Sequence, residues 1–164
     1  MRAALLLFAG LLYGQCSAQT TITTFVLVRH AEKASDGTQD PDLTPEGHAR
    51  AQNLAALLAK EKVSAIYSTA FKRTTQTVAP LAAAKGLSIH TYEPFKADAI
   101  EAMARQHAGG TVVISGHSNT IPWTANLLLG QDTFTDYEEG DYGNLLVVTV
   151  VEKGKAAKVT WLRY

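Results

Sequence analysis

Apolar runs alternate with helical patterns along the chain. Runs rich in Val, Ile and Leu, bounded by polar residues, predict strands at residues 24–28, 64–68, 87–92 and 111–115. Between these runs, apolar residues recur at helical spacing and predict three helices, marked by Ala51, Leu54, Ala55 and Leu58, by Thr74, Thr77, Val78 and Leu81, and by Ile100, Met103, Ala104 and His107. Thr44 and Pro45 suit the N-cap and first position of the first helix, and Gly109 and Gly110 end the third. A fourth helix is predicted from near Pro122 to Leu129.

The last segment, residues 144–164, has a different pattern. Two apolar runs flank a turn with glycine at its centre, Lys153 to Lys155, which predicts a hairpin suited to a sheet edge. Upstream, strands and helices alternate, and this order is typical of parallel strands with crossover helices. The pattern therefore predicts an α/β fold of three layers, a largely parallel sheet with helices on both faces.

The length and composition of the chain indicate one domain, and its net charge is zero. Its 164 residues are 46% hydrophobic and 18% charged, enough for one packed core and too few for two. The 15 basic and 15 acidic residues give a net charge of zero, so we expect no nucleic-acid partner. Any anion site must be local. We predict one domain over residues 19–164, and the sequence alone does not define its oligomeric state.

The first 18 residues resemble a secretory signal peptide. Arg2 precedes an apolar run, and small residues at Cys16 and Ala18 suit cleavage after Ala18. A membrane anchor would need roughly 20 apolar residues, and a buried helix would show a polar face. We expect export to the periplasm or the medium, with no stable membrane insertion after cleavage. Gln15 makes lipidation of Cys16, the only cysteine, unfavourable. Cleavage after Ala18 would remove Cys16, so we expect a mature chain without a thiol.

Polar residues gather where the predicted strands end. Arg29 and His30 follow the first strand, residues 68–73 follow the second, and Gly116 to Thr120 follow the fourth. Because ligands bind beyond the carboxyl ends of parallel strands, these clusters are expected to meet at one edge of the sheet. His30 and His117 each end an apolar strand, where desolvation must be compensated by a partner. We interpret His48, His90 and His107 as ordinary surface or core residues.

The pairing of arginine with histidine favours an anion as ligand. Arg29 and Arg73 offer planar donor groups that match phosphate oxygens, and His30 and His117 add nitrogen atoms beside them. Zinc would need a third ligand, and no suitable residue accompanies the two histidines. A glycine-rich lysine loop for nucleotides is also missing from the sequence. We therefore expect no metal and no cofactor, and a phosphorylated ligand.

Four ordered motifs carry a family resemblance. "LVRHAEK", "LTPEG", "YSTAFKRTTQT" and "VVISGHSNTIP" are similar in order and spacing to those of the histidine phosphatase superfamily, the phosphoglycerate-mutase-like proteins. The resemblance implies that His30 is a nucleophile forming a phosphohistidine, and that Arg29, Arg73 and His117 form the phosphate pocket without a metal. The chain departs from the commoner glycine-containing motif at Ala31. It also lacks the long insertions that select substrates in mutases and acid phosphatases.

The expected mechanism is phosphomonoester hydrolysis. A neutral His30 attacks phosphorus while the arginines and a protonated His117 hold the equatorial oxygens, and water then releases phosphate. The departing oxygen of an alkyl ester needs a proton, which calls for a carboxylic acid. Glu93 follows the third strand directly and is our prediction for this role. Asp98 is the alternative, although a helix N-cap would also explain it.

Three other functions are compatible with these residues. "GHSNT" approaches a nucleophile elbow with Ser118 as the attacking residue of an esterase, although Thr120 replaces the expected glycine. A phosphate-binding module without turnover and a mutase that moves phosphate between hydroxyls are the others. The expected partner is a phosphorylated small molecule or an envelope glycan phosphate. A lipid headgroup or a phosphohistidine is also compatible.

Overall fold

A computed structural model describes residues 21–164, and the predicted signal segment, with Cys16, lies outside this range. The strands are β1 Thr23–Arg29, β2 Val63–Ser68, β3 Ile89–Thr91, β4 Thr111–Gly116, β5 Asn144–Glu152 and β6 Ala156–Arg163. The helices are α1 Pro45–Leu57, α2 Lys72–Lys85, α3 Ala97–Gln106 and α4 Thr120–Leu129. Each predicted element is present.

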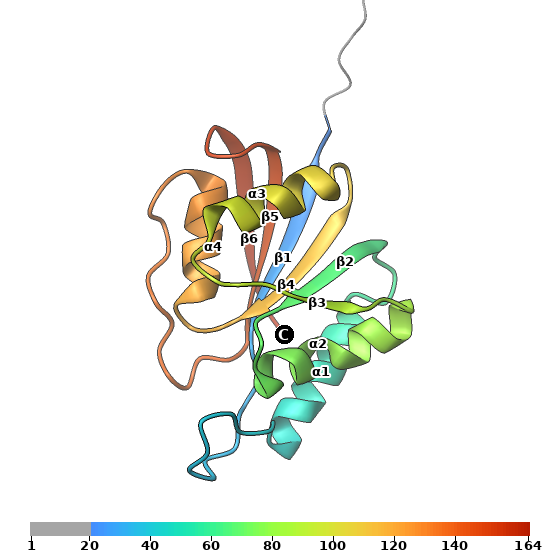
Figure 1. The fold of residues 1–164 in the computed structure, drawn as a ribbon, viewed down its shortest axis with the longest axis vertical. Coiled ribbons are helices and arrows are strands. Elements are labelled where there is room, and N and C mark those ends of the chain that lie inside the picture. The colour runs from blue at the N-terminus through green and yellow to red at the C-terminus, as the bar shows by residue number, and fades with distance from the viewer. Residues whose placement is uncertain (1–20) are drawn as a thin grey trace, which may run out of the picture.

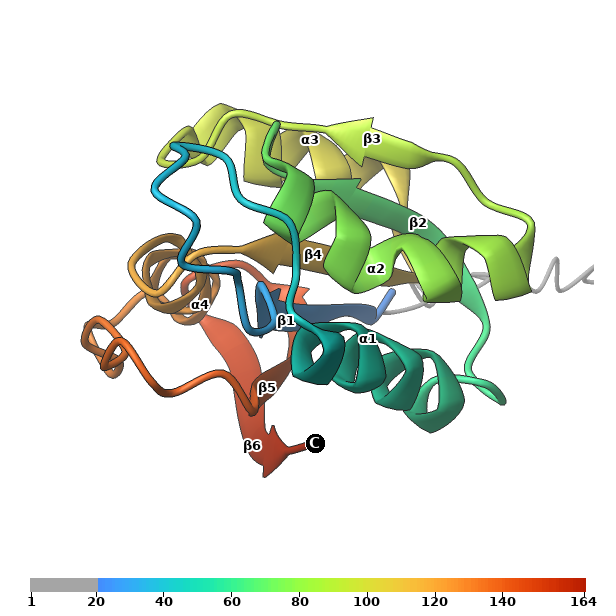
Figure 2. The ribbon, with the colours of Figure 1, turned by 90° about the horizontal axis from the view of Figure 1, so that it is seen from below.

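The strands form one six-stranded sheet in the order β3-β2-β4-β1-β5-β6 (Figure 1). β1 pairs in parallel with β4 and antiparallel with β5, while β2 lies parallel to both β3 and β4. The hairpin of β5 and β6 closes one side of the sheet, as its glycine turn predicted. Helices α1 and α2 cover one face and α3 and α4 the other (Figure 2), which confirms the three-layer α/β architecture.

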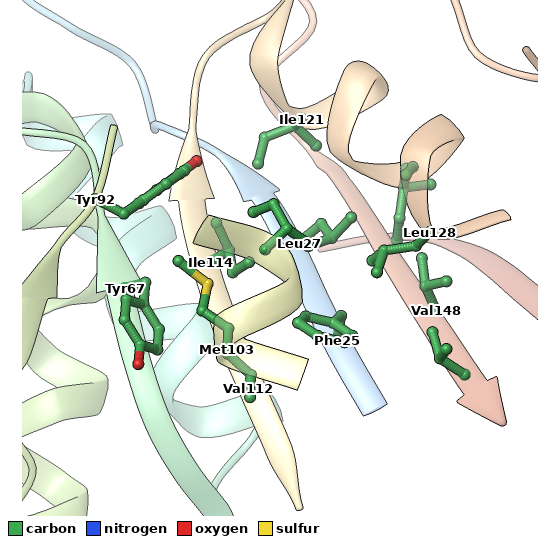
Figure 3. Packing of buried hydrophobic residues seen from close by; sticks show 14 of the residues in the cluster. Phe25, Leu27, Tyr67, Tyr92, Met103, Val112, Ile114, Ile121, Leu128 and Val148 are labelled. Carbon is green, nitrogen blue, oxygen red and sulfur yellow. The ribbon is translucent and has the colours of Figure 1, made fainter. Parts of the chain in front are cut away.

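Alternation along β1 supplies both halves of the core. Phe25 and Leu27 face α3 and α4, where they pack in the cluster that includes Ile121 and Leu128 (Figure 3). Val26 and Val28 point to the opposite face and pack in the cluster of α1 and α2. All four β1 side chains are at most 3% exposed, so the central strand is buried on both faces, as expected for a parallel sheet.

Helix starts agree with the sequence except at α3. The Thr44 side chain accepts a hydrogen bond from the Gly47 N–H, and Pro45 opens α1 as predicted. α3 instead has Lys96 at its N-cap, so Asp98 lies inside the first turn. The explanation of Asp98 as an N-cap is therefore wrong. Its carboxylate still lies at the end of the helix where the dipole favours negative charge.

The carboxyl ends of three strands meet at one level. Arg29 at the end of β1 is in register with Gly116 of β4, and Ser68 of β2 is in register with Ser115. The polar clusters predicted after these strands consequently share one edge of the sheet. Within residues 21–164, no helix is long and apolar enough to cross a membrane.

Candidate active site

His30 lies at the centre of the site, directly after β1. Its backbone N–H donates to the Gly116 carbonyl at 2.8 Å and so extends the pairing of β1 with β4. The ring is 3% exposed, and its Nδ1 lies 2.8 Å from the Ala31 carbonyl oxygen. A carbonyl can only accept, so Nδ1 carries the proton. The lone pair of a neutral His30 is therefore on Nε2.

The surroundings of His30 keep the ring neutral. Burial lowers the pKa of His30 to about 3, and the positive charges of Arg29 and Arg73 act in the same direction. The hydrogen bond to Ala31 opposes this shift without cancelling it. At neutral pH the ring is consequently unprotonated, and a nucleophile requires that state.

The segment after His30 is fixed by close packing. The Ala31 N–H donates to the Thr77 hydroxyl at 2.9 Å, and its methyl group is fully buried. Ala31 does not adopt a positive φ, so glycine is not needed there. Gly47 is needed for a different reason: a Cβ at this position would lie 2.2 Å from the Glu32 carbonyl oxygen. The start of α1 can therefore approach the segment that holds the nucleophile.

Arg29 is held from the loop between α4 and β5. Its Nη1 donates to the carbonyl oxygens of Glu138 at 2.7 Å and Asp141 at 3.2 Å, and its guanidinium lies 4.4 Å from the Tyr142 ring centroid. The side chain is 3% exposed, but its Nε has no hydrogen-bond partner. A buried, fixed guanidinium with an unused donor suits an incoming anion.

Arg73 comes from the first turn of α2. Its guanidinium lies 4.3 Å from the centroid of the Phe71 ring, and its Nη1 is 3.7 Å from Asp40 and 3.5 Å from the Gln39 carbonyl oxygen. Burial lowers the pKa of Arg73, and Asp40 opposes the shift. Its Nε is also buried without a partner. Two arginines thus bring unused donors into this part of the described chain.

His117 is positioned by hydrogen bonds of its backbone N–H and of its ring. A Cβ on Gly116 would lie 2.5 Å from the Thr120 hydroxyl oxygen, and that oxygen accepts the His117 N–H at 2.8 Å. Gly116 therefore allows the first turn of α4 to fold against β4. In the ring, Nε2 of His117 lies 2.9 Å from the Thr69 hydroxyl oxygen.

Hydrogen counting assigns the tautomer of His117. The Thr74 hydroxyl contacts the Phe71 carbonyl at 2.8 Å and the Thr69 carbonyl at 3.0 Å, so its single hydrogen is used there. In the 3.0 Å contact between the two hydroxyls, Thr69 must then donate to Thr74. That leaves Nε2–H of His117 as donor to Thr69. In the neutral ring, Nδ1 carries the lone pair.

The surroundings of His117 lower its pKa. Burial lowers its pKa to about 4, and the charges of Arg73 and Arg29 add to the effect. With only protein groups around it, His117 is neutral at pH 7, whereas the expected mechanism uses a protonated His117 once the substrate phosphate is bound. A phosphate dianion would offset the two guanidinium charges and favour the proton on Nδ1. Protonation of His117 would then accompany binding of the anion.

A cavity of about 510 Å³ brings most of the predicted residues together. Its wall comes from every cluster at this edge of the sheet: Arg29, His30, Lys33, Phe71, Arg73, Pro94, Phe95, His117, Ser118, Asn119, Thr120, Tyr137 and Glu139. The rings of His30 and His117 lie 5.6 Å apart between centroids. The predicted residues Arg29, His30, Arg73 and His117 therefore share one space.

The predicted proton donors lie outside this wall. Glu93 and Asp98 are both exposed, although Pro94 and Phe95, next to Glu93, line the cavity. The carboxylate in the wall is Glu139, which lies 3.8 Å from Lys33. Sequence reasoning missed Glu139 because it belongs to the long loop between α4 and β5, which has no strand end or spacing to mark it. Across residues 21–164, no group of three or more His, Cys, Asp or Glu side chains could hold a metal ion.

Comparison with known proteins agrees with this geometry. The family model for the histidine phosphatase superfamily (branch 1) matches residues 25–96, which include most of β1, His30 and Arg73 of α2. SixA from Nakamurella multipartitia has a similar structure, with a TM-score of 0.62 and 25% identity over 87% of this chain and 96% of that one. The chain is thus similar to the histidine phosphatase superfamily in sequence over residues 25–96 and in fold over most of its length.

Other similar proteins are more distant in sequence or match over a shorter region. The protein histidine phosphatase SixA complexed with tungstate gives a TM-score of 0.68 at 16% identity, over 85% of this chain and 96% of that one. "Phosphoserine phosphatase 1" of Hydrogenobacter thermophilus (strain DSM 6534 / IAM 12695 / TK-6) is 40% identical over 70 residues. That alignment covers 39% of this chain and 33% of the relative, about a third of its length.

Proposed function

We propose that the chain is a phosphomonoester hydrolase that acts through a phosphohistidine on His30. The observation that carries this proposal is the hydrogen bond from Nδ1 of His30 to the Ala31 carbonyl at 2.8 Å, in a ring whose pKa is lowered to about 3. It leaves a lone pair on Nε2 beside two arginines. The match of residues 25–96 to the superfamily model supports the same chemistry.

The first step transfers the phosphoryl group to the enzyme. Nε2 of His30 forms a bond to phosphorus, and the bond from phosphorus to the ester oxygen breaks with its electron pair on the departing oxygen. Arg29 and Arg73 bind the equatorial oxygens, with His117 as a third donor once the anion has raised its pKa. The departing alkoxide takes a proton from a carboxylic acid at the rim, for which Glu93 is our prediction.

The second step returns the enzyme to its starting state. A water oxygen bonds to phosphorus as the bond to Nε2 breaks, and inorganic phosphate leaves with the oxygen of that water. The carboxylate that lost its proton can accept one from this water, so one residue serves both steps. The same positive groups hold the phosphoryl oxygens throughout, so little reorganisation is needed.

The alternatives receive less support from the geometry. Ser118 lines the cavity, but within residues 21–164 no histidine ring hydrogen-bonds its hydroxyl, as a serine esterase would require. A binding module would have no need for a histidine kept neutral among cations. A mutase differs only in the acceptor, hydroxyl instead of water, so phosphate release distinguishes the two.

We further propose that the mature chain begins near Gln19 and acts outside the cytoplasm on a phosphorylated small molecule or an envelope glycan phosphate. The order of basic, apolar and small residues in positions 1–18 supports export. Expression in a bacterial host should give extracytoplasmic protein without the leader. Recovery of cytoplasmic protein that retains Met1 would contradict export.

Phosphate release tests the proposed activity. The purified mature chain is offered phosphoserine, sugar phosphates, a phosphorylated envelope glycan and a phosphohistidine peptide, and inorganic phosphate is measured. We expect release from at least one substrate, with loss of activity in His30→Ala and retention in His48→Asn, an exposed histidine on α1. Isomerised product without phosphate would indicate a mutase, and activity that survives His30→Ala but not Ser118→Ala would indicate an esterase.

A further inference from the structure

Phe95 is an aromatic side chain on the cavity wall with an unusual backbone. It has φ +59°, and within residues 21–164 every other residue with positive φ is a glycine. This left-handed conformation is rare for a bulky residue and persists only where the surrounding structure enforces it. The Phe95 ring lies 5.4 Å from the Trp123 ring in an edge contact, yet the residue is 49% exposed. The chain thus holds a partly exposed ring beside the phosphate site.

Phe71 places a second ring in the same wall. It precedes α2, is 39% exposed, and lies 5.2 Å from the His117 ring in an edge contact. Its face is covered by the Arg73 guanidinium, 4.3 Å away. Both phenylalanines line the cavity that contains His30, so a group attached to a phosphoryl at His30 has aromatic surface within the same space.

Apart from the two arginines, the cavity wall offers an anionic leaving group one cation, and that cation is already paired. Arg29 and Arg73 are assigned to the phosphoryl oxygens, and the remaining cation of the cavity lining is Lys33. Its ammonium lies 3.8 Å from Glu139, which offsets it. The polar lining next to His117 consists of neutral Ser118 and Asn119. A second phosphate or carboxylate on the substrate would therefore find little compensation here.

We infer that the leaving group of the substrate carries a planar aromatic ring, which packs on Phe95 with Phe71 beside it. Aromatic pairs in edge or offset contact gain free energy beyond the burial of their area, and a fixed ring loses little entropy on binding. That the enzyme selects an aromatic ester as substrate rests on the proposed phosphatase function. Tighter binding of an aromatic phosphonate does not require turnover.

Binding of two phosphonates tests this subsite without turnover. Benzylphosphonate and methylphosphonate present similar anions and differ by the ring, and calorimetry gives the affinity of each. From the usual strength of aromatic contacts, we expect benzylphosphonate to bind the wild-type chain about three- to tenfold more tightly. Equal affinities, or tighter binding of methylphosphonate, would overturn the inference.

Phe95→Asn removes the ring while asparagine tolerates the left-handed backbone. This variant should fold and bring the ratio of the two affinities close to one. Trp161→Leu is the matched control, because Trp161 is 55% exposed on β6 and does not line the cavity. An unchanged ratio in Phe95→Asn, or an equal loss in Trp161→Leu, would refute the assignment.

Turnover separates this inference from the proposed function. Benzyl phosphate and methyl phosphate are both alkyl esters, and we expect a higher kcat/KM for the benzyl ester in wild type but not in Phe95→Asn. If neither ester is hydrolysed while the phosphonate preference holds, the ring subsite stands and the phosphatase proposal fails. If both are hydrolysed equally, the ring subsite fails alone. Phosphotyrosine and phosphohistidine then distinguish an oxygen-linked from a nitrogen-linked ring.

Discussion

The Thr69 hydroxyl accepts a hydrogen bond from Nε2–H of His117 at 2.9 Å and donates one to the Thr74 hydroxyl at 3.0 Å. Both threonines are at most 1% exposed. The pair fixes the orientation of the His117 ring and keeps hydrogen on Nε2. Nδ1 is then the nitrogen that would gain a proton if an anion binds, so we expect Thr69 to act as a positioning residue for the proposed phosphate pocket.

Thr69→Val should weaken this arrangement without changing the shape of the side chain. Loss of the hydroxyl leaves Nε2–H of His117 without its acceptor. We expect kcat/KM for a phosphomonoester to fall roughly 10- to 100-fold, by analogy with residues that orient a metal-bound histidine through its other ring nitrogen. Thr69→Ser, which keeps the hydroxyl, should retain most of the activity. A shift in the pH profile of phosphate binding should accompany the valine variant. An unchanged profile with reduced stability alone would indicate a structural role.

Arg73→Lys tests whether the planar guanidinium is required. Lysine keeps the charge but loses the paired donors and the contact with the Phe71 ring, so the transition state loses fixed hydrogen bonds. We expect kcat to fall roughly 100- to 1,000-fold, as on removal of one oxyanion donor. Arg105→Gln, which changes an exposed arginine on α3, is the control and should retain wild-type rates. Near-normal turnover by Arg73→Lys would contradict the pocket assignment.

The sequence predicts the fold and the centre of the site because both follow from strand ends. Apolar runs that stop at Arg29 and at Gly116 define where β1 and β4 end, and parallel pairing brings His30 and His117 together. Thr44 with Pro45 defines the start of α1 through local chemistry alone.

Other parts of the site have no sequence pattern. Arg29 is held by the carbonyls of Glu138 and Asp141, and a backbone acceptor does not depend on residue type. The left-handed backbone of Phe95 is rare for a bulky residue, so local preference gives no signal of it. The neutral state of His117 depends on burial, which is a property of the folded chain.

The proton donor is tested with esters of different leaving groups. Glu93→Gln should slow hydrolysis of an alkyl phosphate roughly 100-fold while sparing an aryl phosphate, because only the more basic departing oxygen needs the proton. Glu139→Gln is the companion variant, since Glu139 lines the cavity. Asp98→Asn, in the first turn of α3, tests the earlier alternative. If only Glu139→Gln shows the selective loss, Glu139 is the acid and the assignment of Glu93 is wrong.

Acid should destabilise the fold through His30. Its pKa is about 3 in the native chain and 6.5 in an unperturbed histidine, so the unfolded chain binds more protons between these values and unfolding becomes easier as pH falls. From pH 7 to pH 5 this amounts to about 2 kcal/mol. Urea titrations should show a smaller loss over this interval for His30→Asn than for wild type. Equal losses in the two proteins would contradict the lowered pKa.

The covalent intermediate on His30 is the central claim, and trapping it is the most direct test. The chain is mixed with a substrate that it turns over, quenched within milliseconds under alkaline conditions that preserve phosphohistidine, digested and sequenced by mass spectrometry. We predict a phosphoryl group on His30, no label in His30→Ala, and at least about a thousandfold loss of rate in that variant. A phosphoryl group on Ser118 or another residue, or turnover by His30→Ala near the wild-type rate, would contradict the account.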